Sequence, residues 1–197
     1  MEKIIEHGNE HPGQPSSDER AAARPLPFLR NGIIQVCQVV KDLDQAVRGY
    51  WDLFGIGPWR LYTYGKPLLK RLDYHGQPVE SRFRVGLCWI GPLCIELVEQ
   101  VDGNSIYADF VRDHGYGLHH LGVKVEEMEA AIAQAKAAGL SILQEGGGHG
   151  ADGSGHFAYL DTEAEIGTII ELIQAPKIRV APEGVYPPED EHGGGAA

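Results

Sequence analysis

Four polar side chains stand in apolar, strand-like stretches of the sequence: Gln35, Glu96, His120 and Glu171. Burying an isolated carboxylate is costly unless a cation or a close partner compensates it. Two glutamates in such stretches therefore require a positive partner. An amide, an imidazole and two carboxylates form a mixed donor set that suits Zn²⁺, Fe²⁺, Co²⁺, Mn²⁺ or Ni²⁺. The sequence thus predicts one divalent metal ion held by these four residues.

The four residues occupy matching positions of an internal repeat. The segment QVCQVVKDLDQAV, which starts at Gln35, aligns without gaps on HLGVKVEEMEAAI, which starts at His120. The segment LCIELVEQ at 93–100 likewise resembles TIIELIQAP at 168–176, which matches Glu96 with Glu171. Taken singly, each residue has an ordinary explanation, such as a solvated strand face for a glutamate. The repeat favours the metal site, because chance would not place all four at equivalent positions.

The elements that must position these residues follow the same order in both halves of the chain: a strand, a helix and three strands. In the first half, the β-branched run at 33–40 predicts a strand. Asp42 can cap a helix that runs to about Phe54, where glycines and a proline end it. Further strands are expected at 59–64, 82–90 and 93–99, and the polar insert at 65–81 is expected to form an open loop or a long hairpin.

A short amphipathic helix at about 105–114 leads into the second half. The glycine-rich stretch at 146–155 has neither a strand nor a helix pattern and is expected to be a flexible loop. The other predicted elements are a strand at 119–125, an alanine-rich helix at 126–138, and strands at 141–144, 156–160 and 168–174.

Together these elements predict an α+β fold in which paired βαβββ modules form a curled mixed sheet around a metal-containing cleft. The two ends of the chain are rich in Gly, Pro and charged residues and lack periodicity, so disorder is expected there. The expected boundaries are a disordered N-terminal arm at 1–28, a first module at 29–102, a linker helix at 103–116, a second module at 117–176 and a C-terminal tail at 177–197.

Composition narrows the classes of partner. The formal net charge of −11 disfavours a nucleic acid or an anionic membrane as partner. No apolar run approaches the roughly 20 residues needed to span a bilayer, and the N-terminus lacks the apolar core of a signal peptide. Cys37, Cys88 and Cys94 lie in apolar runs without CxxC spacing, which indicates buried, reduced thiols. A cytoplasmic protein is expected.

From about residue 30 to 176 the chain resembles the vicinal oxygen chelate superfamily, which includes glyoxalases, methylmalonyl-CoA epimerases, extradiol dioxygenases and antibiotic-resistance proteins. The resemblance is strongest in LHHLGVKVEEMEAAIAQAKAAG and GTIIELIQAP. Members carry His or Gln seven residues before the acidic residue that opens the first helix, as Gln35 stands before Asp42. Their carboxylates lie in the last strand of each module, where this chain has Glu96 and Glu171. The resemblance implies the same four-residue ligand set.

The resemblance also implies a reaction. We expect a metal-dependent isomerase, epimerase or lyase that transfers a proton alpha to a carbonyl through a metal-chelated enediolate or enolate, with Glu171 or Glu96 as the base. The alternatives are a glyoxalase-type lyase acting on a 2-oxoaldehyde adduct, a ring-cleaving dioxygenase, or a metal-free binding protein. Gln35 in place of a histidine disfavours oxygen chemistry. The expected partner is a small carbonyl substrate, with an acyl-CoA or a hydroxy-ketone as candidates, and a homodimer is a further expectation.

Other residues have weaker indications. His119 should point to the sheet face opposite His120, and it is expected to pack or to support a ligand rather than to bind the metal. His149 and His156 flank the glycine-rich stretch, where a lid could bring them to the substrate. Arginines on strands could hold a substrate carboxylate or a phosphate, or be ordinary surface charges. The arginines in question are Arg60, Arg82 and Arg84, and the aromatic residues that could wall the cleft or pack in the core are Trp59, Tyr62, Tyr64, Trp89 and Tyr159.

Overall fold

The first half of the chain folds into a unit whose helix is delimited by capping residues. The computed structural model describes residues 25–188. The Asp42 carboxylate accepts a hydrogen bond from the Gln45 amide at 2.9 Å and begins the helix, and Gly55, at a left-handed φ of 66°, ends it. The elements of this half are β1 (Gln35–Val39), α2 (Leu43–Phe54), β2 (Trp59–Tyr64), β5 (Ser81–Ile90) and β6 (Leu93–Gly103).

The second half repeats this order after a connecting helix, α3 (Ile106–His114). Its elements are β7 (Gly117–Lys124), α4 (Met128–Ala137), β8 (Ile142–His149), β9 (Gly155–Leu160), the short helix α5 (Glu163–Ile166) and β10 (Ile169–Gln174). The predicted order of strands and helices is present in both halves. The boundaries between modules stay a prediction.

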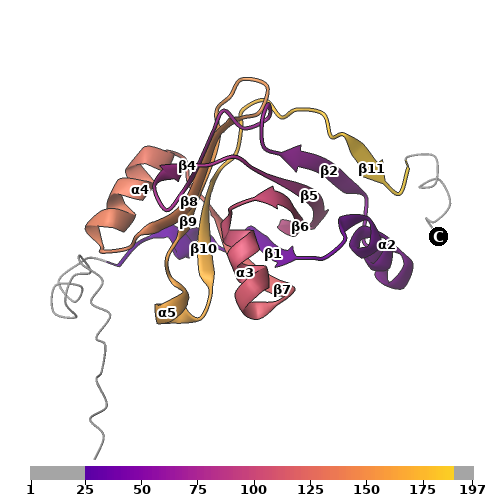
Figure 1. Cartoon of the computed structure of the whole chain (residues 1–197), viewed down its shortest axis with the longest axis horizontal. Helices are drawn as coiled ribbons and strands as arrows, with labels where there is room; N and C mark the ends of the chain where they lie inside the picture. Colours follow the sequence, from indigo (N-terminus) through magenta and orange to yellow (C-terminus); the bar gives the residue numbers. More distant parts are fainter. Residues whose placement is uncertain (1–24, 189–197) are drawn as a thin grey trace, which may run out of the picture.

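All strands join one mixed sheet in the order β11-β2-β5-β6-β1-β7-β10-β9-β8-β3-β4, where β3 is Arg71–Tyr74, β4 is Gln77–Pro78 and β11 is Gly184–Tyr186 (Figure 1). The halves meet where β1 pairs antiparallel with β7, and each central strand pairs in parallel with the last strand of its own half. The Tyr64 ring centroid on β2 nevertheless lies 5.7 Å from that of His149 on β8. The sheet therefore curls until its wings face each other, which confirms the predicted fold class.

Helices α2 and α4 cover the outer face of this sheet. Leu43 of α2 packs with Leu97 of β6, and Ile132 of α4 packs with Leu172 of β10, all in buried apolar clusters. Side chains alternate between the two faces of a strand. The residues before Leu97 and Leu172, which are the predicted ligands Glu96 and Glu171, therefore project from the inner face.

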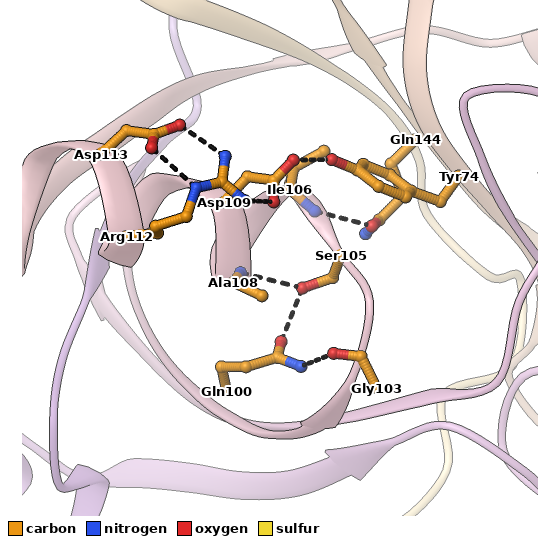
Figure 2. Close-up of polar contacts among 10 residues, drawn as sticks. All are labelled: Tyr74, Gln100, Gly103, Ser105, Ile106, Ala108, Asp109, Arg112, Asp113 and Gln144. Atoms are coloured by element: carbon orange, nitrogen blue, oxygen red, sulfur yellow. Dashed lines mark hydrogen bonds and ion pairs between the residues drawn. The ribbon is translucent and has the colours of Figure 1, made fainter.

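Helix α3 is fastened to strands of both halves (Figure 2). The Ser105 hydroxyl caps the helix and donates to Gln100 Oε1 on β6 at 2.6 Å. The Ile106 amide donates to Gln144 Oε1 on β8 at 3.1 Å. These bonds hold Tyr107, which is 1% exposed, against the inner face of the sheet.

Two segments expected to be loops are more ordered than the sequence indicated. The insert at 65–81 forms the hairpin of β3 and β4, one of the two expected forms, and β3 pairs with β8 of the other half. The prediction of a flexible loop at 146–155 is wrong for its first part, because β8 continues to His149. Gly146 pairs with Phe157 on β9 and with Leu72 on β3. A Cβ at Gly146 would lie 2.1 Å from Phe157 Cζ, so glycine here permits close packing rather than flexibility.

The predicted disordered ends also need correction. Residues 1–24 and 189–197 lie outside the described residues. Within the expected arm at 1–28, Phe28 begins a short 3-10 helix, η1 (Phe28–Asn31), and is 7% exposed, because it packs in the cluster beside α4. Within the expected tail at 177–197, β11 pairs antiparallel with β2. No helix in the range 25–188 has the length and apolar character to cross a membrane.

Adding a methyl group at Gly146 should lower the free energy of unfolding. Because the Phe157 ring must move, we expect Gly146→Ala to cost about 2 kcal/mol, as overpacked cores do. Gly49→Ala is the matched control, since Gly49 lies within α2 with nothing within 4 Å of its added Cβ. It should gain about 0.5–1 kcal/mol from helix propensity. Urea unfolding measures both changes, and equal effects would contradict the packing argument.

Candidate functional site

Cys37, in the central strand β1, aligns two of the four predicted ligands. It lies opposite Glu96 on β6 and opposite His120 on β7. Residues directly opposite each other project from the same face of a sheet, so the Glu96 and His120 side chains converge across Cys37. Burial, reinforced by the charge of Glu96, raises the pKa of the fully buried Cys37 thiol well above its usual value. Cys37 is therefore a neutral thiol and no nucleophile.

Gly122, on β7, aligns the other two predicted ligands. Gln35 on β1 lies opposite Gly122, which in turn pairs with Glu171 on β10. A Cβ at Gly122 would lie 2.8 Å from Gln35 Cβ and 2.7 Å from Ile173 Cδ1. The missing side chain lets the Gln35 side chain cross β7 and reach Glu171. Sequence analysis did not single out this glycine, which stands where the first half has Cys37.

The four side chains meet at one point. Gln35 Nε2 donates to Glu96 Oε2 at 3.0 Å and to Glu171 Oε2 at 2.9 Å. His120 Nε2 lies 3.3 Å from Glu96 Oε2 and 3.0 Å from Glu171 Oε2. Each residue is at least nine-tenths buried, with exposed fractions of 9% for Gln35 and Glu96, 1% for His120 and 4% for Glu171. The structure therefore brings together all four residues named from the sequence.

The cluster has more negative than positive groups. Burial works against a charged His120, but the carboxylates of Glu171 and Glu96 outweigh it and raise the pKa of the imidazole to about 9. Burial raises the pKa of Glu171, and the neighbouring His120 opposes that rise. One imidazole faces two carboxyl groups, so the cluster carries one uncompensated negative charge when both are ionised. A cation would complete the cluster.

The donor set fits a divalent ion. Donor atoms of Glu96, His120 and Glu171 all lie within 4.8 Å of one another. Two ligands at right angles on an ion with bonds of about 2.1 Å are about 3 Å apart, which resembles the 2.9–3.3 Å between these groups. The oxygen and nitrogen of an amide are interchangeable by a flip, so Gln35 can also present Oε1. A metal bound at His120 Nε2 would require that nitrogen to be deprotonated.

His119 does not point away from the site as expected. In the pairing of β7 with β1, Cys37 faces His120 and the next residue, Gln38, faces Leu118, so His119 forms a β-bulge. Its Nδ1 lies 2.8 Å from His120 Nδ1. Burial lowers the pKa of His119 well below its usual value, with a further contribution from the charge of His120. A neutral His119 can therefore hold the His120 ring and leave its Nε2 turned toward the carboxylates.

A cavity of about 300 Å³ opens from the cluster. Gln35, Glu96 and Glu171 line it at one side, and most of the other lining residues are apolar or aromatic. Tyr107, which sequence analysis missed, joins this wall, and its hydroxyl lies 2.6 Å from that of Tyr159. Of the aromatic residues expected to wall the cleft, the lining includes Tyr62, Tyr64, Trp89 and Tyr159, and the two histidines that flank the glycine-rich stretch, His149 and His156, also line it. Trp59 instead packs in the core beside α2 and is 0% exposed.

Comparison with known proteins identifies the family. Residues 34–159 match the model of the glyoxalase/bleomycin resistance protein/dioxygenase superfamily. The chain belongs to this superfamily. The resemblance to the vicinal oxygen chelate proteins is thereby confirmed. No curated protein sequence matches the chain.

Solved structures with the same fold include several epimerases of this superfamily. Methylmalonyl-CoA epimerase from Mycobacterium tuberculosis is 20% identical with a TM-score of 0.56, and the match covers 80% of this chain and 95% of that one. A variant of the Streptomyces coelicolor epimerase bound to 2-nitronate-propionyl-CoA is 17% identical with a TM-score of 0.55, covering 73% and 96%. A hypothetical protein from Bacillus halodurans C-125 is 21% identical with a TM-score of 0.51, covering 75% and 96%. At these identities the matches show the fold.

The arginines named from the sequence do not line the cavity of this superfamily member. Arg82 Nε donates to Asp102 at 2.8 Å, and Arg84 pairs with Asp44 at 2.7 Å. The Arg60 guanidinium lies over Trp89, 5.4 Å from the ring centroid, and outside the lining. The cavity arginine is Arg179, which belongs to the segment expected to be a C-terminal tail at 177–197.

A second cluster of possible ligands lies elsewhere, formed by Glu129, Glu145 and His156. The Arg71 guanidinium contacts the Glu145 carboxylate and lies 3.1 Å from His156 Nε2. Because Arg71 already supplies the positive charge, this cluster has no need of an ion. The four-residue cluster at the side of the cavity is the stronger candidate.

His149 should make stability depend on pH. Burial, with a smaller effect from His156, lowers its pKa to about 4. As pH falls from about 6.5 toward 4, this histidine binds a proton in the unfolded chain but not in the folded chain. The free energy of unfolding therefore decreases. By pH 5 this loss is about 2 kcal/mol. His149→Phe keeps an aromatic ring beside Tyr64 and Phe157 but cannot titrate. Urea unfolding from pH 7.5 to 5 should show the variant losing less stability; a constant difference between the two proteins would contradict this assignment.

Proposed function

We propose that this chain is a metal-dependent isomerase, epimerase or lyase that transfers a proton at the carbon next to a carbonyl. The observation that supports it is the convergence of two buried carboxylates, one imidazole and one amide at the side of an apolar cavity. A binding protein without a metal gains nothing from burying two carboxylates beside a single imidazole.

In this proposal Gln35, Glu96, His120 and Glu171 hold the ion. A divalent ion there would polarise the substrate carbonyl and stabilise the negative charge that develops as the proton leaves. Glu96 or Glu171 accepts the proton at a carboxylate oxygen, since both line the cavity. An epimerase needs a group to remove the proton and a group to return it, and the cavity offers two carboxyl groups. The apolar walls keep water from protonating the carbanion first.

The donor set argues against the superfamily's oxygen chemistry. Iron sites that activate oxygen commonly use two histidines and one carboxylate. Here one histidine stands with two carboxylates and an amide, and His119 turns its Nδ1 toward His120 rather than joining the set. A glyoxalase-type lyase is the second candidate, because each half contributes a carboxylate to the donor set. In this respect the set resembles that of the glyoxalase branch.

The cavity limits the substrate to a small reacting group. About 300 Å³ is at the lower end of ligand sites, so it suits the acyl part of a thioester or a small hydroxy-ketone. One of the neighbouring structures is a methylmalonyl-CoA epimerase in complex with methylmalonyl-CoA, which supports testing acyl-CoA thioesters first. A cytoplasmic location and a homodimer remain predictions from the sequence.

Metal content tests the proposed ligands. We expect the protein, loaded with excess divalent ion and then dialysed, to keep about one equivalent. Glu171→Ala and His120→Ala should each lose most of it, because each removes a donor from the set. Glu145→Ala is the matched control: it removes a glutamate paired at 2.9 Å with His156 in the other cluster, and should leave the metal content unchanged. Full retention by both site variants would refute the metal site.

Exchange of the substrate's alpha hydrogen with deuterated solvent tests the reaction. Acyl-CoA thioesters, hydroxy-ketones and 2-oxoaldehyde adducts are incubated without oxygen, and deuterium uptake is followed by mass spectrometry. Replacing the base by its amide, through Glu96→Gln or Glu171→Gln, should slow exchange by a factor of about 10²–10⁴. The variant with the larger loss identifies the base. Turnover that consumes oxygen and shows no exchange would instead favour a dioxygenase.

A further inference from the structure

Residues 175–183, which join β10 to β11, form a strap across the mouth of the cavity. Near its start, the Ile178 carbonyl accepts a hydrogen bond from the Ala151 amide at 2.9 Å, and the Lys177 amide donates to Ser154 Oγ at 2.8 Å. Both contacts are to the turn between β8 and β9, in the second half. Figure 1 shows the strap running from this turn to β11 beside β2.

The far end of the strap is fastened to the first half. Strand β11 pairs antiparallel with β2. The Glu183 carboxylate accepts hydrogen bonds from the Thr63 amide at 3.0 Å and from the Thr63 hydroxyl at 2.8 Å. The strap is therefore held at both ends by different wings of the curled sheet, and between the two anchors Arg179 and Val180 line the cavity.

Arg179 lies between these anchors and lines the cavity. Its guanidinium carbon is 5.1 Å from the centroid of the Trp89 ring, which also lines the cavity. No arginine or lysine other than Arg179 is among the lining residues of the described chain, and within residues 25–188 no carboxylate forms an ion pair with it. A guanidinium held over an aromatic ring by a cation–π interaction uses no N–H hydrogen bond for that contact, so its N–H groups stay available to a ligand.

The cavity has two different polar ends. The cluster of Gln35, Glu96 and Glu171 is at least nine-tenths buried, whereas Arg179 is exposed at the rim. Apolar residues such as Leu87, Ile173 and Val180 line the space they share. A ligand that satisfies both ends has a carbonyl at the buried cluster, an apolar middle and an anionic group at the rim.

We propose that Arg179 selects substrates that carry an anionic group at the end remote from the reacting carbonyl. The substrate class rests on the proposed function, but the binding of an anion at Arg179 does not. Arg60 provides a matched control, because it lies over the same Trp89 ring and does not line the cavity.

Two fluorescent probes of nearly equal shape test the charge preference without metal or turnover. The anionic probe is 1-anilinonaphthalene-8-sulfonate, and N-phenyl-1-naphthylamine lacks its sulfonate. We expect Arg179→Ala in the full chain to weaken binding of the anionic probe about tenfold, as for a lost charged hydrogen bond. Binding of the neutral probe should change by less than about twofold, and Arg60→Ala should change neither. Equal losses for the two probes, or equal losses in the two variants, would overturn the proposal.

Displacement of the neutral probe by octanoate and by octyl phosphate distinguishes a carboxylate from a phosphate group. The anion that displaces it at the lower concentration in the wild type, and loses that advantage in Arg179→Ala, identifies the group. If 1-octanol competes as well as both anions, the cavity has no charge preference and the proposal fails. Anion selectivity together with absent metal binding and absent hydrogen exchange would reject the proposed reaction while retaining the role of Arg179.

Discussion

The structure is organised around the burial of two glutamates within reach of one another. Glu96 and Glu171 each lie within hydrogen-bond distance of the same amide nitrogen, Gln35 Nε2. Such a pair is tolerated in an apolar interior only where positive or donating groups surround it. This requirement places Gln35 and His120 on the two central strands, between the strands that carry the glutamates. It also leaves a deficit of positive charge that a divalent ion would supply.

The part of the site that belongs to the repeat could be predicted from the sequence. A polar residue in an apolar strand is conspicuous, and the alignment of the halves matched Gln35 with His120 and Glu96 with Glu171. Strand pairing then converts equal positions in the repeat into one meeting point. His119 shows where this reasoning stops. Alternation along a strand assumes regular pairing, and the bulge at His119 breaks it, which brings its ring against His120.

The remaining errors come from segments whose structure depends on distant partners. The glycines of β8 have little strand propensity, yet strands on both sides supply their hydrogen bonds, and the missing side chains admit the Phe157 ring. Strand β11 is short and ends before prolines, and β2 supplies its hydrogen bonds. The local amino-acid composition does not indicate that either segment pairs with a distant strand. Arg179 was missed for a related reason: the strap has no counterpart in the repeat, so no matching position drew attention to it.

This division between repeated and unrepeated parts has a functional consequence. The duplicated units give the four-residue cluster near-twofold symmetry, with one carboxylate from each half. A symmetric centre alone cannot fix which end of a substrate enters first or which face of its alpha carbon is presented. The asymmetric contacts come from segments that occur once: α3 brings Tyr107 against Tyr159, and the strap brings Arg179 to the rim. Under the proposed function, the unrepeated segments would therefore orient the substrate, and the repeated units would transfer the proton.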